Sequence, residues 1–157
     1  MKLDLASFDI RDSMRAAAEG VQDRLAQDQI KLELRTAPDI GAFVADERRI
    51  RQVLFNLLSN AVGFSPKGGT VVLAAERRPD ALVLSVADQG PGIPPEMKDR
   101  VFDWFESHPL GSRHRGVGLG LSIVRSFIAL HGGTVRIDSE VGRGTTVICE
   151  LPAQLLS

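Results

Sequence analysis

Apolar residues between positions 46 and 66 recur with the period of an α-helix. They fall three or four residues apart, which places them on one helical face that would be buried. The members of this stripe are Ile50, Val53, Leu54, Leu57, Leu58, Ala61 and Phe64. Asp46 is a suitable N-cap and Glu47 is favourable in a first turn. The pattern therefore predicts a long helix that begins after Asp46 and ends at Ser65-Pro66.

A short polar row lies beside this apolar stripe. Asn56 and Asn60 are four residues apart, and Gly63 follows at the next equivalent position, so the three share one side of the predicted helix. Side-chain amides this close to a core need hydrogen-bond partners. Either the backbone satisfies the two asparagines or a bound ligand does.

The remaining patterns predict further helices and strands. Helical spacing covers residues 13–29, with Asp12 as the N-cap, and residues 121–130. Alternating apolar and polar positions predict strands over residues 30–36, 70–76, 81–88, 134–138 and 145–151, of which the second and third, and the last two, form hairpins. Residues 42–45 are a short apolar pass, and residues 1–10 read as an extended arm or the tail of an upstream element.

These elements describe one domain of the α/β class. We expect a two-layer sandwich in which about three helices cover a mixed β-sheet. Residues 89–120 are rich in Gly and Pro around a short predicted helix at residues 96–105. A loop this long inside a compact domain is usually functional or mobile.

Composition narrows the classes of partner. The 157 residues suit one domain, and a net charge of −1 with 25% charged residues describes an ordinary surface without a nucleic-acid groove. The single cysteine, Cys149, lies in an apolar run and fits a reduced, cytosolic setting. No apolar stretch reaches the roughly 18 residues of a membrane span, so we expect no membrane contact by this domain and any anchor of the parent to lie upstream.

Asp88 is the first candidate for ligand chemistry. It ends a predicted strand and is followed by QGPGI, where the backbone must turn sharply. One interpretation is an aspartate that caps this turn. The other is a carboxylate that accepts a hydrogen bond from an exocyclic amine, which would favour adenine over guanine.

Gly116, Gly118 and Gly120 precede a predicted helix. Closely spaced glycines free backbone N–H groups to face an anion, and the helix dipole adds to the attraction. The segment is thus a candidate phosphate cradle, with a plain hinge as the alternative. It lacks the Lys-Ser/Thr ending of a P-loop and does not follow a strand as a dinucleotide fingerprint does.

The histidines do not form a recognisable site. His108 and His114 lie in the long loop and His131 at a helix end, away from any cluster of Cys or carboxylate residues. We interpret all three as solvated or capping residues.

Four motifs occur in a fixed order: NLLSNA at residues 56–61, DQGPGI at 88–93, FDWF at 102–105 and GVGLGL at 116–121. They resemble the N, G1, F and G2 boxes of the catalytic ATP-binding domain of bacterial sensor histidine kinases, the GHKL or Bergerat fold. The similarity runs from about Phe8 to Pro152 and ends in a pattern typical of that family, SEVGRGTTVICELP. The long loop also looks like that of alphaproteobacterial kinases of the DivL type.

The resemblance implies ATP and Mg²⁺ as ligands and a role for each motif. Asn60 would coordinate Mg²⁺ and Asn56 would support the metal, Asp88 would read adenine, and Phe64 would line the adenine pocket. Residues 89–120 would form the nucleotide loop and lid, with Phe102 and Phe105 anchoring the lid to the core. The other implied nucleotide contacts are Gly90, Gly92, Ile93, Arg113, Arg115, Gly116, Val117, Gly118, Leu119, Gly120 and, through water, Thr146.

The first N-box residue narrows the reaction. ATP-hydrolysing relatives carry a glutamate there, whereas this chain has Asn56, and an amide is no general base. Phosphoryl transfer needs mainly positioning and charge stabilisation. The resemblance therefore implies a kinase domain that presents the γ-phosphate to a histidine on a separate dimerisation domain, in a homodimeric, cytoplasmic parent that signals to a response regulator or partner kinase.

Gly63 departs from the family pattern. Relatives often carry a cation two or three residues after the metal asparagine, where it meets the phosphates, and here Lys67, Arg113 or Arg115 would have to compensate. This departure supports an alternative, a pseudokinase that binds nucleotide weakly and regulates other kinases or response regulators by protein contact.

Overall fold

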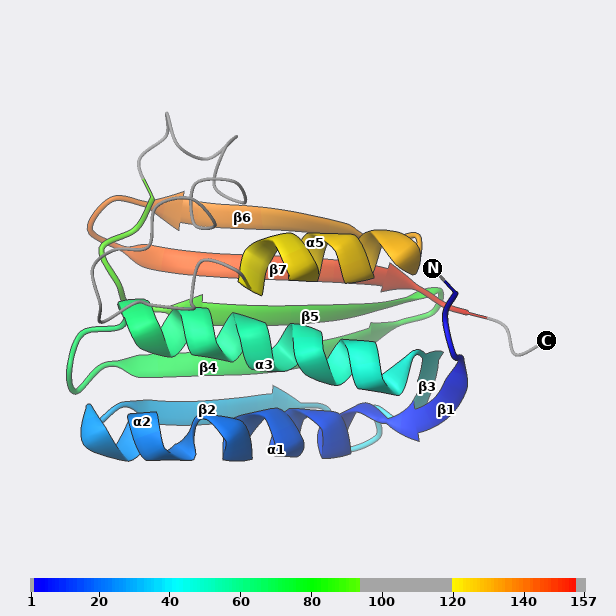
Figure 1. The fold of residues 1–157 in the computed structure, drawn as a ribbon, viewed down its shortest axis with the longest axis horizontal. Helices are drawn as coiled ribbons and strands as arrows, with labels where there is room; N and C mark the ends of the chain where they lie inside the picture. Colours follow the sequence, from blue (N-terminus) through cyan, green and yellow to red (C-terminus); the bar gives the residue numbers. More distant parts are fainter. Residues whose placement is uncertain (1, 94–119, 155–157) are drawn as a thin grey trace.

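The fold is a five-stranded mixed sheet with helices packed on one face (Figure 1). The computed structural model describes residues 2–93 and 120–154. The strand order is β2-β4-β5-β7-β6, in which β2 (Lys31–Thr36) runs parallel to β4 and all other neighbours are antiparallel. The remaining strands of the sheet are β4 (Thr70–Arg78), β5 (Ala81–Asp88), β6 (Thr134–Glu140) and β7 (Gly144–Pro152). The predicted two-layer α/β class and both predicted hairpins are confirmed.

The central helix, α3 (Glu47–Phe64), has the predicted bounds. Its apolar stripe is buried from Ile50 to Ala61, while Phe64 is half-buried. The Asp46 carboxylate accepts a hydrogen bond from the Arg49 N–H at 3.2 Å and so caps the first turn as predicted. Asn56, Asn60 and Gly63 are buried as well, so the polar row lies inside the molecule.

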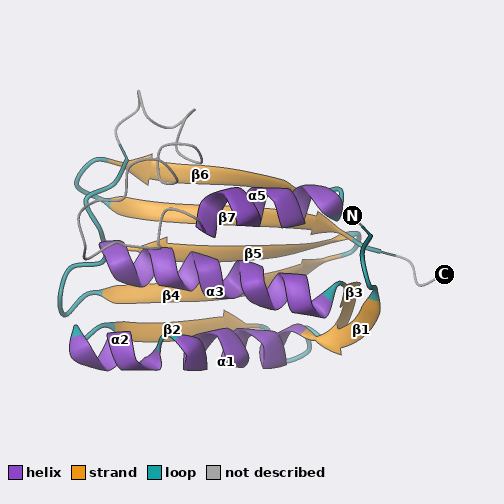
Figure 2. Cartoon of the chain, viewed as in Figure 1, coloured by secondary structure: helices purple, strands orange, loops and turns teal. Residues whose placement is uncertain are grey.

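The N-terminal segment is extended at residues 6–9, as predicted, but the helices that follow it differ from their prediction. Residues Ala6–Asp9 form β1, which pairs with β3 (Ala42–Ala45) in a separate two-stranded sheet. The first helix, α1 (Ile10–Gly20), begins three residues earlier than expected and is followed after Val21 by a separate helix, α2 (Gln22–Gln27). With α5 (Gly120–Leu130), the described residues contain four helices rather than about three (Figure 2).

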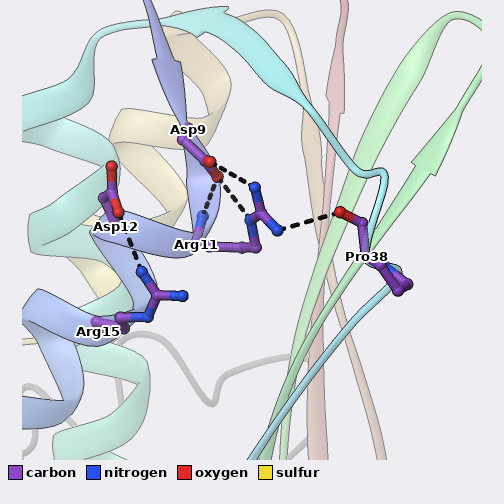
Figure 3. Close-up of polar contacts among 5 residues, drawn as sticks. All are labelled: Asp9, Arg11, Asp12, Arg15 and Pro38. Carbon is purple, nitrogen blue, oxygen red and sulfur yellow. Dashed lines mark hydrogen bonds and ion pairs between the residues drawn. The ribbon is translucent and has the colours of Figure 1, made fainter.

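The cap of α1 is Asp9, so the prediction of Asp12 is wrong. The Asp9 carboxylate accepts a hydrogen bond from the Arg11 N–H at 2.9 Å and forms an ion pair with the Arg11 side chain at 2.8 Å (Figure 3). Arg11 also donates to the Pro38 carbonyl, which ties the start of the helix to the loop after β2. Asp12 lies within the first turn and pairs only with Arg15 among the labelled residues (Figure 3).

One apolar core lies between the helices and the sheet. It contains the inward residues of α3, α5 and the central strands, among them Leu57, Leu73, Leu84, Ile128 and Leu151. The α3 C-terminus, the end of β5 and the β6–β7 turn reach the same edge of the sheet (Figure 1). This edge therefore brings the first two sequence motifs close to the β6–β7 turn.

Candidate nucleotide site

The C-terminal half of α3 supplies the two asparagines. Asn60 is 7% exposed, and neither its Oδ1 nor its Nδ2 has a hydrogen-bond partner among the described residues. The Asn56 amide is also buried, and its Oδ1 accepts a hydrogen bond from Gln52 Nε2 at 2.8 Å. An unpaired buried amide is costly, which makes Asn60 a residue whose polar atoms fit a ligand.

Asp88 lies at the end of β5 with a perturbed acidity. Burial raises the pKa of its carboxyl to about 6, against the opposing effect of hydrogen bonds from the Gly90 and Thr145 N–H groups. The Asp88 Oδ1 accepts the Gly90 N–H at 2.8 Å, so the turn-capping interpretation is correct. A turn cap does not require a desolvated carboxylate, and the burial indicates a place shielded for a ligand as well.

The strand register bears on one predicted contact, that of Thr146. Asp88 pairs with Thr145, and Ala87 pairs with Thr146. Because side chains alternate between the faces of a sheet, Thr145 shares the helix-facing side with Asp88, and Thr146 points to the opposite side. The register therefore favours Thr145, rather than the predicted Thr146, as the threonine beside Asp88. The signal was in the sequence, since Thr145 is in phase with the buried Val147, Cys149 and Leu151.

The glycines after Asp88 have a packing role that the sequence did not predict. A Cβ on Gly90 would lie 2.6 Å from the Phe64 carbonyl oxygen, and one on Gly92 would lie 2.2 Å from the Glu140 carbonyl oxygen. Gly92 also has a φ of +82°, which a side chain disfavours. These glycines let the loop pack on α3 and on the end of β6, and Ile93 is buried in the core.

A cleft of about 620 Å³ opens beside the end of α3. Gly63, Phe64 and Gly90 line it, together with Lys67 and Gln89. It thus joins the N-box helix to the loop after β5. Asn60 and Asp88 are not among its lining residues, so the cleft adjoins the buried polar groups rather than enclosing them.

His131 is a buried capping residue, so the alternative of a solvated side chain is wrong for it. Its Nε2 accepts the Asp46 N–H at 3.1 Å and its Nδ1 lies 2.7 Å from the Phe127 carbonyl oxygen. These contacts join the end of α5 to the start of α3. In residues 2–93 and 120–154 no group of three or more His, Cys, Asp or Glu could hold a metal ion.

The rest of the predicted lid lies outside the described residues. This applies to the helix at residues 96–105 and to Phe102, Phe105, His108, Arg113, His114, Arg115, Gly116, Val117, Gly118 and Leu119. Gly120 is the first residue of α5. Ser139 is a residue that the sequence reasoning missed, because only the fold shows that this strand residue is 3% exposed and hydrogen-bonded to the Ile93 N–H.

Residues 45–155 match the family model for histidine kinase-, DNA gyrase B-, and HSP90-like ATPases. The chain belongs to this family, and its fold and motifs are those of the catalytic ATPase domain of sensor histidine kinases.

The similar sequences include histidine kinases and sensor proteins. The chain is 40% identical to the histidine protein kinase DivJ of Caulobacter vibrioides over 98% of its length, and 39% identical to the circadian input-output histidine kinase CikA of Synechococcus elongatus over 85%. The sensor protein DivL of Caulobacter vibrioides is 34% identical over 97% of the chain, as the loop resemblance suggested. The chain spans only 26%, 18% and 19% of these three proteins, respectively.

The solved structures that resemble this fold are also histidine kinases. Full-length ShkA in complex with AMPPNP superposes with a TM-score of 0.83 at 33% identity, covering all of this chain and 33% of ShkA. The catalytic domain of histidine kinase ThkA gives a TM-score of 0.81 at 28% identity, covering 96% of this chain and 97% of that domain. ThkA in complex with the response regulator TrrA gives 0.78 at 27% identity, covering 96% and 42%. None of the described helices is long and apolar enough to cross a membrane.

Proposed function

We propose that this domain binds ATP with Mg²⁺ and presents the γ-phosphate to a histidine on a dimerisation domain of its parent protein. The observation that carries the proposal is the buried amide of Asn60, which has no hydrogen-bond partner in residues 2–93 and 120–154 and lies beside Asn56 on α3. Amide oxygens are ligands that suit Mg²⁺, which keeps several waters and is held by few protein groups. A divalent ion bound here would neutralise charge on the phosphate oxygens.

Each described site residue has a role in this proposal. Asn60 holds the metal through its amide oxygen and Asn56, oriented by Gln52, supports it. The Asp88 carboxylate and the Thr145 hydroxyl face the base edge from neighbouring strands, and Phe64 borders the base. The lid residues keep their predicted roles: Arg113, Arg115, Gly116, Val117, Gly118, Leu119 and Gly120 meet the phosphates or hinge the lid.

The residue type at position 56 favours transfer of the γ-phosphate over hydrolysis of ATP. Asn56 stands where a hydrolase needs a glutamate, and its amide cannot accept a proton from water. The domain therefore holds ATP until an acceptor histidine arrives, and catalysis depends on positioning. Apart from Gly63 in the sequence, no contact among the described residues and no related protein favours the pseudokinase alternative.

The partners follow from the same activity. We infer a homodimeric parent whose phosphorylated histidine passes the group to a response regulator, of the kind that accompanies ThkA. The domain would work in the cytoplasm, where its nucleotide is supplied.

The experiment combines binding and transfer. Calorimetry with ATP and Mg²⁺ should give saturable binding, and Asn60→Ala should abolish it. Ser59→Ala, at the preceding position of the same helix, should leave the binding intact. Adding the parent's dimerisation domain should then give acid-labile phosphohistidine with the wild-type domain only. Tight nucleotide binding without any phosphohistidine would overturn the kinase function, and ATP binding that survives Asn60→Ala would overturn the assigned site.

A further inference from the structure

Three neighbouring strands place one polar side chain each in a row. Asp88 on β5 pairs with Thr145 on β7, and Thr145 pairs with Ser139 on β6. The row behind it is apolar, with Val86, Val147 and Ile137 packed in or against the core. The helix-facing side of the sheet therefore changes from apolar to polar at the edge proposed for the nucleotide.

Ser139 connects the loop after β5 to the β6–β7 turn. Its hydroxyl oxygen accepts the Ile93 N–H at 2.8 Å and lies 3.0 Å from the Gly144 carbonyl oxygen. The Gly142 N–H donates to the Pro91 carbonyl at 2.8 Å, which adds a second link between the same segments. Ser139 is thus the buried centre of a clamp on the loop that follows Asp88.

Counting donors fixes the direction of the third hydrogen bond. A serine hydroxyl has one proton and two lone pairs. A carbonyl oxygen can only accept, so the Ser139 proton goes to Gly144, and the Ile93 N–H occupies one lone pair. The Thr145 hydroxyl, 2.8 Å from Ser139 Oγ, must then be the donor to the remaining lone pair.

We propose that Ser139 is a positioning residue that makes the Thr145 hydroxyl an acceptor toward the bound base, so that the site selects a purine with a 6-amino group. Because the Thr145 hydroxyl donates its hydrogen bond to Ser139, only the lone pairs of the Thr145 oxygen face the ligand. The Asp88 carboxylate beside it likewise presents only lone pairs. A 6-amino group donates to such acceptors, whereas a 6-carbonyl meets them with its own lone pairs. This inference rests on the proposed nucleotide function.

The test compares ATP with inosine triphosphate, which carries a carbonyl in place of the 6-amino group. In Ser139→Ala the Thr145 hydroxyl is free to turn and donate, so the preference for ATP over inosine triphosphate should fall about 3- to 10-fold. If Ser139 had a merely structural role, Ser139→Ala would weaken the binding of both nucleotides equally and leave the ratio of their affinities unchanged. Ser85→Ala, a strand serine outside the row, is the matched control and should keep the wild-type ratio.

A second variant covers the case in which Ser139→Ala does not fold. Thr145→Val keeps Ser139 but removes the acceptor, and it should lower the same ratio to a similar extent; the double variant should add nothing further. An unchanged ratio in folded Ser139→Ala or in Thr145→Val overturns the inference while the nucleotide function stands. If the wild-type domain binds neither nucleotide, the proposed function itself fails, and this inference with it.

Discussion

At the scale of single residues, the charged Asp88 carboxylate opposes folding, and its role in the proposed function is to bind the base. Its folded-state pKa of about 6 lies above the ordinary value of 3.8, so between these values the folded domain binds more protons than the unfolded chain. The free energy of unfolding therefore falls as pH rises through this window, and above pH 6 the charged carboxylate costs on the order of 3 kcal/mol. A ligand that donates hydrogen bonds to the carboxylate would recover part of that cost.

Asp88→Asn should therefore stabilise the nucleotide-free domain and abolish ATP binding. An amide oxygen can still accept the Gly90 N–H, but it carries no charge to desolvate. Urea unfolding from pH 4 to pH 8 should show a variant advantage of about 1–3 kcal/mol at pH 8 that shrinks toward pH 4. A variant less stable than wild type at pH 8 would contradict this account of the carboxylate.

Adjacent threonines offer a matched test of the strand register. Thr145→Val should weaken ATP binding about 3- to 10-fold because it removes a hydroxyl beside Asp88. Thr146→Val, on the other side of the sheet, should leave the dissociation constant within about twofold of wild type. Calorimetric titration of the two variants checks the difference, and the reverse order of effects would restore the Thr146 prediction.

At the scale of elements, the β6–β7 turn depends on a close backbone approach. A Cβ on Gly144 would lie 2.1 Å from the Asp88 carbonyl oxygen, whereas one on Gly142 would meet nothing within 4 Å. Both glycines have a positive φ, +93° and +86° respectively. Alanine substitutions at these two glycines therefore separate the free-energy cost of a positive φ, which both share, from the cost of the steric contact, which only Gly144 has.

Gly142→Ala should lower the free energy of unfolding by about 1 kcal/mol, the strain of an alanine at positive φ. Gly144→Ala should cost about 2–3 kcal/mol more, because the β5 backbone cannot move aside cheaply, and it should weaken ATP binding as Asp88 shifts. Denaturant unfolding measures both costs. Equal values for the two variants would show that the contact is relieved without strain.

The start of α3 is held by a buried carboxylate. Burial by itself would raise the pKa of Asp46, but hydrogen bonds from the Asp4 and Arg49 N–H groups and from the Arg49 side chain lower it overall. These contacts of the Asp46 carboxylate stabilise the fold fully above the pKa that Asp46 has in the unfolded chain, and the stabilisation is lost as pH falls below that value.

Asp46→Ala should lower the free energy of unfolding by about 2–4 kcal/mol, since it leaves the part-buried Asp4 and Arg49 N–H donors unsatisfied and removes the cap. Asp46→Asn keeps an acceptor for the Arg49 N–H and should cost less than half as much. Thermal unfolding at pH 7 ranks the variants against wild type. Similar losses for both would mean that the charge, not the cap, stabilises this helix.

Local signals explain which elements were predictable. The α3 bounds follow from its apolar stripe and from Asp46, whose capping role needs only adjacent residues. The start of α1 was misplaced because Asp9 and Asp12 are both acceptable caps in sequence. What selects Asp9 is the pairing of β1 with β3, a contact between distant segments that sets where the strand stops and the helix begins.

At the scale of the whole molecule, the two ends of the fold have separate tasks. One edge of the sheet gathers the α3 C-terminus, the end of β5 and the β6–β7 turn, and the opposite end holds the N-terminus and the start of α3 (Figure 1). The first two motifs were predicted to share a site, and the α3 C-terminus and the end of β5, where they lie, reach the first edge. The motifs could not predict the row of Asp88, Thr145 and Ser139, because that row exists only once β5, β7 and β6 pair in register.

Binding at this edge should stabilise the entire domain. A ligand that binds only the folded state raises the free energy of unfolding by about 2.7 kcal/mol at one hundred times its dissociation constant. ATP with Mg²⁺ should therefore raise the melting temperature of the wild-type domain in proportion to the logarithm of its concentration. Differential scanning calorimetry across a range of nucleotide concentrations measures this dependence.

Asn60→Ala should separate the two contributions of this residue. Truncating a buried side chain usually costs stability, but here it also removes two polar atoms that have no partner among the described residues, so the nucleotide-free variant should unfold within about 1 kcal/mol of wild type. Its melting temperature should not respond to ATP. Asn56→Ala, which breaks the bond from Gln52, should lose more stability without ligand. A strongly destabilised Asn60→Ala would show that the Asn60 amide stabilises the nucleotide-free fold. It would then contradict the account in which the hydrogen-bonding groups of this amide are satisfied only by the ligand.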